Sequence, residues 1–333
     1  MGVLLVFCTG LILAQAAWAK DSFFYKEINL IGGYSDKDRW IGKNGMMANS
    51  LGFEYYKKFS GSYGDYMTAD LQMRVAYDSL KNSYDAWGLE IHNAWLEYKL
   101  RPEAKIKIGH FDPAFGLEPV LDTHATLLQT LADDNIGFTK DWGVALKGSF
   151  PEFDYKAALQ LGSGMSVRRQ DGSFLSTIRV GTPASRNLQY GFSMLYGKVL
   201  ESEGMSTFPK NTLLSPDAVT KKRLGLDAQY LIGPYLFKGE AAYGKNNGTD
   251  VLGYLTGIDY TLPRHQNWQV ELQYRSWINE LNQDSSDDST ITLGTSYKLN
   301  QSTTLGAAFS HDINLMGHEE ENRFVVQLYF FGA

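Results

Sequence analysis

Lysines and carboxylates gather around one stretch of the chain in a spacing suited to selecting charged solutes. Lys105 and Lys107 alternate with Ile106 and Ile108, so a strand would place the two lysines on one face and the two isoleucines on the other. The acidic residues that follow are Asp112, Glu118, Asp122, Asp133 and Asp134. Opposite charges across a narrow aqueous gap, inside low-dielectric walls, focus a field that selects solutes by charge. These residues therefore indicate electrostatic selection of ions.

Neighbouring strand-like segments repeat the basic bias at positions expected to face the same side. The basic set is Lys99, Lys105, Lys107, Lys147, Lys156 and Arg179. Only Glu97 and Asp154 oppose it in these segments. We expect the six cations to form one wall of a water-filled channel and the five acids to face them. The alternative is that these charges pair with one another and fix the acidic segment in place.

Bond-making chemistry is not indicated. None of the six histidines stands at a metal-ligand spacing such as HExxH, and no phosphate-binding glycine loop occurs. Ser310, His311 and Asp312 are consecutive, and neighbours in a strand point to opposite faces, so Ser310 and His311 cannot converge on one substrate. We expect no catalytic residues, no metal and no cofactor, and hence no enzyme.

The elements that position these charges read as strands with a period of two. In 71–77, Leu71, Met73 and Val75 share one face, while Gln72 and Arg74 share the other. Sixteen such segments are predicted: 24–34, 47–59, 65–79, 89–100, 103–110, 141–149, 153–163, 174–182, 187–198, 222–231, 234–245, 250–262, 266–278, 289–299, 302–311 and 322–331.

Most of the connections between these segments alternate between short and long. Short turns on one side, longer loops on the other and an even strand number are typical of an outer-membrane barrel. A strand of about 10 residues rises ~33 Å and, tilted by ~40°, spans the apolar band of that membrane. The sequence therefore predicts an all-β fold, a transmembrane antiparallel β-barrel of about 16 strands, with outer-membrane lipid around it.

The third long connection, 111–140, differs from an ordinary surface loop. Its apolar residues, which include Val120, Leu121, Leu127, Leu128 and Leu131, need a place to bury. The nearest place is the interior of the barrel. We expect this third extracellular loop to fold into the lumen, with a short helix, and to narrow the pore.

The first nineteen residues are apolar and end in Ala17-Trp18-Ala19, which is typical of a cleaved signal peptide. The expected organisation is a signal peptide over 1–19 and one barrel over 20–333, exported to the bacterial outer membrane. The single cysteine, Cys8, lies in the apolar segment, so disulfides play no part in the barrel. A net charge of −6 disfavours nucleic acid as a partner.

Residues 88–164 carry a family resemblance. The stretches AWLEYKL, KIKIGHFDPAFGLEP, DWGVALKG and AALQLGSG follow one another in an order and spacing that resembles the phosphate-selective porins of the O and P type. The resemblance implies a sixteen-stranded porin, a homotrimer, with its third extracellular loop folded inward. Anion-selective members line the constriction with lysine and arginine, whereas this loop is acidic, so phosphate selectivity does not carry over.

Two functions fit the sequence. The first is a porin, a water-filled channel for passive diffusion of ions and small hydrophilic solutes, with mixed or cation-leaning conduction. The alternative is a structural barrel that sheaths a partner protein, such as an electron-transfer cytochrome. An inward-folded loop would obstruct a protein guest, which favours the channel.

Overall fold

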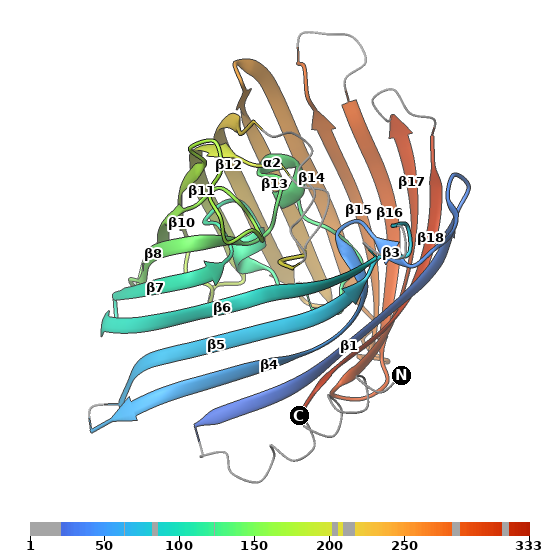
Figure 1. Cartoon of the computed structure of the whole chain (residues 1–333). Helices are drawn as coiled ribbons and strands as arrows, with labels where there is room; N and C mark the ends of the chain where they lie inside the picture. Colours follow the sequence, from blue (N-terminus) through green and yellow to red (C-terminus); the bar gives the residue numbers. More distant parts are fainter. Residues whose placement is uncertain are drawn as a thin grey trace.

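The computed structural model forms one cylinder of strands around a central space (Figure 1). The structure describes residues 21–333 apart from Tyr63, 82–85, Thr123, 202–205, 209–216, 282–286 and 315–319. The predicted signal peptide, 1–19, lies outside the described residues.

Sixteen long antiparallel strands make the wall, as the sequence predicts. They are β1 (Ser22–Ser35), β4 (Met47–Gly61), β5 (Gly64–Tyr77), β6 (Trp87–Arg101), β7 (Ala104–Phe111), β8 (Asp141–Ser149), β9 (Asp154–Gln160), β10 (Phe174–Gly181), β11 (Leu188–Val199), β12 (Val219–Ile232), β13 (Tyr235–Asn246), β14 (Thr249–Thr261), β15 (Trp268–Ile278), β16 (Asp287–Lys298), β17 (Thr303–Asn314) and β18 (Asn322–Gly332). Two short strands, β2 (Arg39–Ile41) and β3 (Lys43–Asn44), extend the hairpin between β1 and β4 and are additional to the prediction.

The sheet closes on itself. Strand β1 pairs with β4 on one side and with β18 on the other, where Lys26 lies opposite Gly332 and Ser35 opposite Arg323. A closed sheet leaves no edge with unpaired backbone groups, which lipid could not hydrate. The prediction of a closed antiparallel barrel is confirmed. Among the described residues, no helix is long and apolar enough to cross a bilayer.

Side chains alternate between an apolar outer face and a polar inner face. In β12, Leu224 and Leu226 are 48% and 62% exposed on the outside, while Arg223 and Asp227 are buried on the inside. The same alternation runs through the neighbouring strands, because successive side chains of a strand point to opposite faces. A wall of this kind suits lipid outside and water inside.

In the described part of the segment between β7 and β8, the helical structure is limited to two single turns. They are η2 (Glu118–Val120) and α2 (Ala132–Asn135), with extended and turn structure between them. The short helix expected in this segment is therefore one turn long, at its C-terminal end. The Thr126 hydroxyl accepts a hydrogen bond from the Leu128 N–H, and the Thr130 hydroxyl accepts one from the N–H of Ala132, the first residue of α2. Such local bonds favour turns over a continuous helix.

Polar side chains join the first and last strands on the inner face. The Tyr329 hydroxyl donates to Glu27 Oε1 at 2.9 Å, and Gln327 Nε2 donates to Asn29 Oδ1 at 2.9 Å. Glu27 also accepts hydrogen bonds from Gln72 and Arg74 of β5, each at 2.9 Å. One buried carboxylate therefore connects three strands across the closing seam.

Replacing Tyr329 by phenylalanine should weaken this seam. The change removes one donor to a buried carboxylate, at an expected cost of about 1.5 kcal/mol in the free energy of unfolding. Urea unfolding in phospholipid vesicles measures it. Tyr190→Phe, on the exposed outer face, is the matched control and should stay within about 0.5 kcal/mol of the wild type. Equal stabilities of the two variants would contradict a stabilising role for the Tyr329 hydroxyl.

Candidate pore constriction

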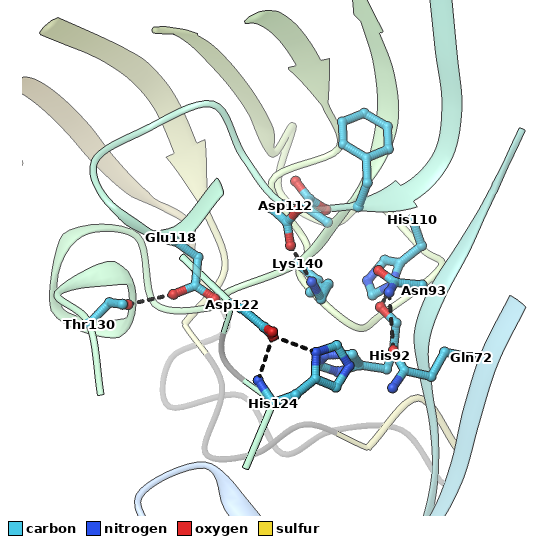
Figure 2. A network of polar contacts seen from close by, with 12 residues as sticks. Gln72, His92, Asn93, His110, Asp112, Glu118, Asp122, His124, Thr130 and Lys140 are labelled. Atoms are coloured by element: carbon cyan, nitrogen blue, oxygen red, sulfur yellow. Dashed lines mark hydrogen bonds and ion pairs between the residues drawn. The ribbon is translucent and has the colours of Figure 1, made fainter. Parts of the chain in front are cut away.

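The segment 112–140 is anchored at its base by one acid and two lysines. Asp112 pairs with Lys140, so the two ends of the segment hold each other, and Lys156 Nζ of β9 donates to the Asp112 carbonyl at 2.6 Å. Figure 2 shows the Asp112–Lys140 pair beside His110. Burial alone would raise the pKa of Asp112, but the charges of Lys140 and Lys156 outweigh it and lower that pKa.

From this base the segment follows the inner faces of three strands. The backbone N–H of Ala114 donates to Thr177 of β10, and that of Gly116 donates to Ser193 of β11. The Leu117 N–H donates to Glu240 Oε2 of β13 at 3.0 Å. Gly116 has φ +64°, which other residues adopt only with strain, and a Cβ there would meet the Glu240 carboxylate, so glycine suits this approach.

The middle of the segment reaches the far side of the barrel. Asn44 Nδ2 of β3 donates to the Leu127 carbonyl at 2.8 Å, and Gln129 Nε2 donates to the Asn44 carbonyl at 2.8 Å. The Leu127 side chain packs among Ile31, Ile41, Ala308 and Val325 of the inner wall. Burial of these apolar side chains is the driving force that the sequence indicates for this segment.

The return path is fixed by charged groups of the opposite wall. Asn135 Nδ2 donates to Glu240 Oε1 at 3.1 Å, Lys221 Nζ of β12 donates to the Ile136 carbonyl at 3.1 Å, and Asp134 lies 3.5 Å from Arg275 of β15. All of these partners belong to buried or half-buried inner-face positions. The described part of the segment therefore lies inside the cylinder, where Figure 1 shows α2.

The predicted basic residues form a row across five adjacent strands. In the register of β6 to β10, Lys99 lies opposite Lys105, Lys105 opposite Lys147, Lys147 opposite Lys156 and Lys156 opposite Arg179. Three of the lysines surround one carboxylate, Glu97, at 3.8 Å from Lys105, 4.0 Å from Lys107 and 2.5 Å from Lys147. The row is therefore a mixed network with a positive excess.

Arg179 has a partner that the sequence analysis missed. Its guanidinium binds Asp227 of β12 with two hydrogen bonds, at 3.0 and 2.5 Å. Both side chains are buried. The alternation in 224–230 does predict that Asp227 faces the lumen. It does not predict that Asp227 lies within reach of Arg179, because the two residues belong to different strands that are not sequence neighbours.

The predicted acids do not all face the basic row. Asp112 lies beside the row, where Lys156 donates to its carbonyl, while Asp134 faces Arg275. Glu118 accepts a hydrogen bond from Thr130 at 2.5 Å, and Asp122 pairs with His124 at 2.7 Å (Figure 2). This arrangement differs from the single acidic face that the sequence suggests, because the segment turns through the barrel and presents successive acids to different strands.

A cavity of about 110 Å³ lies between this segment and the wall made by β1, β4, β5, β6 and β18. Glu118, His124 and Asp133 line it from the segment, and the wall contributes charged side chains, namely Glu27, Arg74, Glu90 and His92. These four wall residues were not singled out in the sequence, although Arg74 does lie on the predicted polar face of 71–77. Across the cavity, the acids thus face a mixed wall.

The carboxyl groups of the segment differ in their proton affinity. Burial, together with Asp134 and Glu118 nearby, raises the pKa of Asp133 to about 7 against the opposing effect of Arg275. Burial also raises the pKa of Glu118, despite the hydrogen bond from Thr130. The hydrogen bond from His124 lowers the pKa of Asp122. One side-chain oxygen of Asp133 is buried without a hydrogen-bond partner among the described residues.

No protein-family model matches the chain, and no curated protein matches it in sequence. Solved structures do match it in fold. OmpT of Vibrio cholerae, an outer membrane protein in a trimer form, aligns with a TM-score of 0.65 over 93% of this chain and 98% of its own, at 13% identity. The chain has the fold of an outer-membrane porin.

Two further structures carry the same porin fold. An anion-selective porin from Comamonas acidovorans aligns with a TM-score of 0.65 at 13% identity, over 93% of this chain and 99% of its own. The outer membrane channel DcaP of Acinetobacter baumannii aligns with a TM-score of 0.62 at 13% identity, over 95% and 99%. At these identities the porin fold is shared while the charged residues of the interior are free to differ. Among the described residues, no cluster of His, Cys, Asp or Glu is arranged to hold a metal.

Proposed function

We propose that the chain is an outer-membrane porin that conducts ions and small hydrophilic solutes by passive diffusion. The observation that carries this proposal is a closed sixteen-stranded barrel whose inner face is charged and whose outer face is apolar. A barrel of this strand number encloses an aqueous channel. Export through a cleaved signal peptide over 1–19 and assembly into a homotrimer are parts of the same proposal, and the trimer form of one structural neighbour supports the latter.

The constriction is the cavity between the segment 112–140 and the wall of β1, β4, β5, β6 and β18. Its lining contains Glu27, Glu90, Glu118 and Asp133 against Arg74 and two histidines. This composition supports mixed conduction that favours cations. The row of basic residues on β6 to β10 forms a second wall, nearer the short turns, that attracts anions. Membership of the phosphate-selective O and P type rests on the motifs in 88–164 and belongs to this proposal, but phosphate selectivity does not.

A structural barrel around a partner protein is the competing function. The segment 112–140 contacts β10 to β13, β15 and β3, so its path crosses the space that a guest protein would need. Ions and small solutes need much less space than a guest protein, and a cavity of about 110 Å³ lies beside the segment. These contacts therefore favour a channel over a sheath.

Planar bilayer recording tests the function. Single channels should give ohmic conductance, and the reversal potential in asymmetric potassium chloride should indicate a preference for cations. Repeating the measurement with phosphate and with organic acids gives the order of solutes. A barrel without conductance that co-purifies with a haem protein would contradict the channel and support the sheath.

A further inference from the structure

A pair of lysines faces outward on the lipid side of the barrel, where a charged residue is unusual. Lys222 of β12 and Lys245 of β13 lie directly opposite each other in the register. Their strand neighbours, Leu224 and Tyr243, are each 48% exposed on the outer face, whereas Arg223 and Gly244 turn inward and are buried. Like charges placed opposite each other on one face of a sheet are destabilising unless something compensates them.

The compensation inside the chain is incomplete. Lys245 lies 3.3 Å from Asp250 of β14, and Lys222 stands over the ring of Tyr196 of β11 at 5.6 Å. Among the described residues, Lys222 forms no ion pair. The group of Lys222, Lys245 and Asp250 therefore keeps one net positive charge on the outer surface.

The depth of these lysines places them at the level of lipid headgroups. Ten residues separate Lys222 from Ile232 at the short-turn end of β12, and Lys245 from Tyr235 at the same end of β13. Ten residues of tilted strand span about 25 Å, the height of the apolar band. Tyr196 and Tyr243 stand at the same level as the lysines, as expected of an interfacial aromatic girdle.

Below the lysines the outer surface is hollowed. A groove of about 560 Å³ runs over β10 to β13, and its apolar part is lined by Ile178, Met194 and Leu224. These three side chains are 41%, 46% and 48% exposed. The groove thus has two cations and two tyrosines at one end and an aliphatic floor at the other, and it begins at the end of the barrel with the long loops.

We propose that this groove is a specific site for a lipid with a phosphorylated headgroup, drawn from the leaflet at the long-loop end. The phosphate lies between Lys222 and Lys245, and an acyl chain lies along Ile178, Met194 and Leu224. Ammonium groups bind phosphate oxygens through charge-assisted hydrogen bonds, and the bound phosphate removes the repulsion between the two lysines. This site is separate from the pore and does not depend on which solute the pore conducts.

Native mass spectrometry of the full chain in neutral detergent tests the site, with diphosphoryl lipid A as the probe and phosphatidylcholine as the lipid without net charge. Lysine contributes about a fivefold change in affinity for an anionic lipid, so Lys222→Gln with Lys245→Gln should weaken lipid A binding about 30-fold. The double arginine variant, Lys222→Arg with Lys245→Arg, should bind as the wild type does. Phosphatidylcholine binding should be the same in all variants.

A charge-matched control comes from the opposite end of the outer face. Lys26 of β1 lies on the same outward face as Leu30, near a short turn. Lys57 of β4 likewise lies on the outward face of Leu51. Lys26→Gln with Lys57→Gln removes the same charge and should leave lipid A binding unchanged. If both double glutamine variants lost lipid A affinity equally, the effect would come from overall charge, and the proposal would be overturned. Circular dichroism checks that each variant forms its sheet.

A second copy of the chain is the other possible occupant of this face. If Lys222→Gln with Lys245→Gln changes the oligomeric state and leaves lipid A binding unchanged, the face is an interface between copies and the lipid site is rejected. If this double variant changes neither lipid A binding nor the oligomeric state, the lipid site is rejected as well. The conductance of the double variant should equal that of the wild type, because the lipid site is separate from the pore. A wild type without conductance would refute the porin proposal but would not bear on the lipid site.

Discussion

Replacing Asp112 by asparagine is expected to release the segment 112–140 from the barrel wall. The substitution leaves Lys140, whose side chain is 9% exposed, without its carboxylate, and the loss of one member of a buried ion pair costs about 3 kcal/mol. The open form of the segment should then be populated on the order of 100-fold more often. Cleavage of the folded barrel within 112–140 by a broad-specificity protease measures this population.

Asp122→Asn is the matched control for this experiment. Asp122 belongs to the same segment, and its side chain is 81% exposed beside His124. Its removal should change the cleavage rate by less than about threefold. Cleavage of the Asp112 variant at the wild-type rate would show that apolar burial alone holds the segment.

The ion pair also sets how the docked segment responds to acid. The pKa of Asp112 is lower in the folded protein than in the unfolded chain, so its stabilising contribution is fully present above the ordinary carboxyl pKa of about 3.9. The contribution is lost as the pH falls through the lower folded value. Protection of 112–140 from protease in the wild type should therefore persist through mildly acidic conditions.

Ion selectivity is expected to depend on pH through Asp133. Below its pKa of about 7 this carboxyl group is neutral, and above it the group adds a negative charge to the cavity. One charge at close range in water is worth about 1 kcal/mol, so the cation-to-anion permeability ratio should rise about fivefold from pH 5 to pH 9. Reversal potentials in a potassium chloride gradient measure the ratio. Asp133→Asn should remove this rise and shift the selectivity toward anions.

Several charged groups face Asp133 and require a control. They are Glu118, Asp134 and Arg275 beside it and Glu27, Arg74, Glu90, His92 and His124 around the cavity. Asp134→Asn removes a negative neighbour and frees Arg275, so it should keep the pH dependence but move its midpoint below 7. The double asparagine variant should shift selectivity furthest toward anions. An unchanged reversal potential in Asp133→Asn across the whole pH range would exclude Asp133 from the constriction.

The wall of the barrel is predictable because its cause is local. Leu224 and Leu226 alternate with Arg223 and Asp227 whatever the remaining strands do, and lipid on one side with water on the other enforces that alternation. Strand ends follow from turns such as Ile232-Gly233-Pro234, where Gly233 has φ +56°. The short strands β2 and β3 escaped prediction because they exist through pairing with β1 and β4 and carry no pattern of their own.

The candidate site is predictable only in part because its contacts join distant strands. The basic row of Lys99 to Arg179 follows from inner-face parity and hairpin register, which are local properties. The contact partners of the segment 112–140 do not follow from such local properties. Glu240 accepts hydrogen bonds from Leu117, 123 residues away in the sequence, and from Asn135, 105 residues away. Residue spacing does not predict contacts over such distances. Buried apolar residues indicate that the segment enters the barrel, but they do not indicate which wall it reaches.

The bond between Asn44 and Leu127 has a consequence for the order of biogenesis. The docked segment needs β3 at one end of the chain, β15 far along it and a wall that includes Ala308 and Val325 near the other end. The wall that holds the Leu127 side chain is complete only when β18 has paired with β1. The last contacts of the segment are therefore expected to form as the cylinder closes, so freshly assembled molecules should leak more than mature ones.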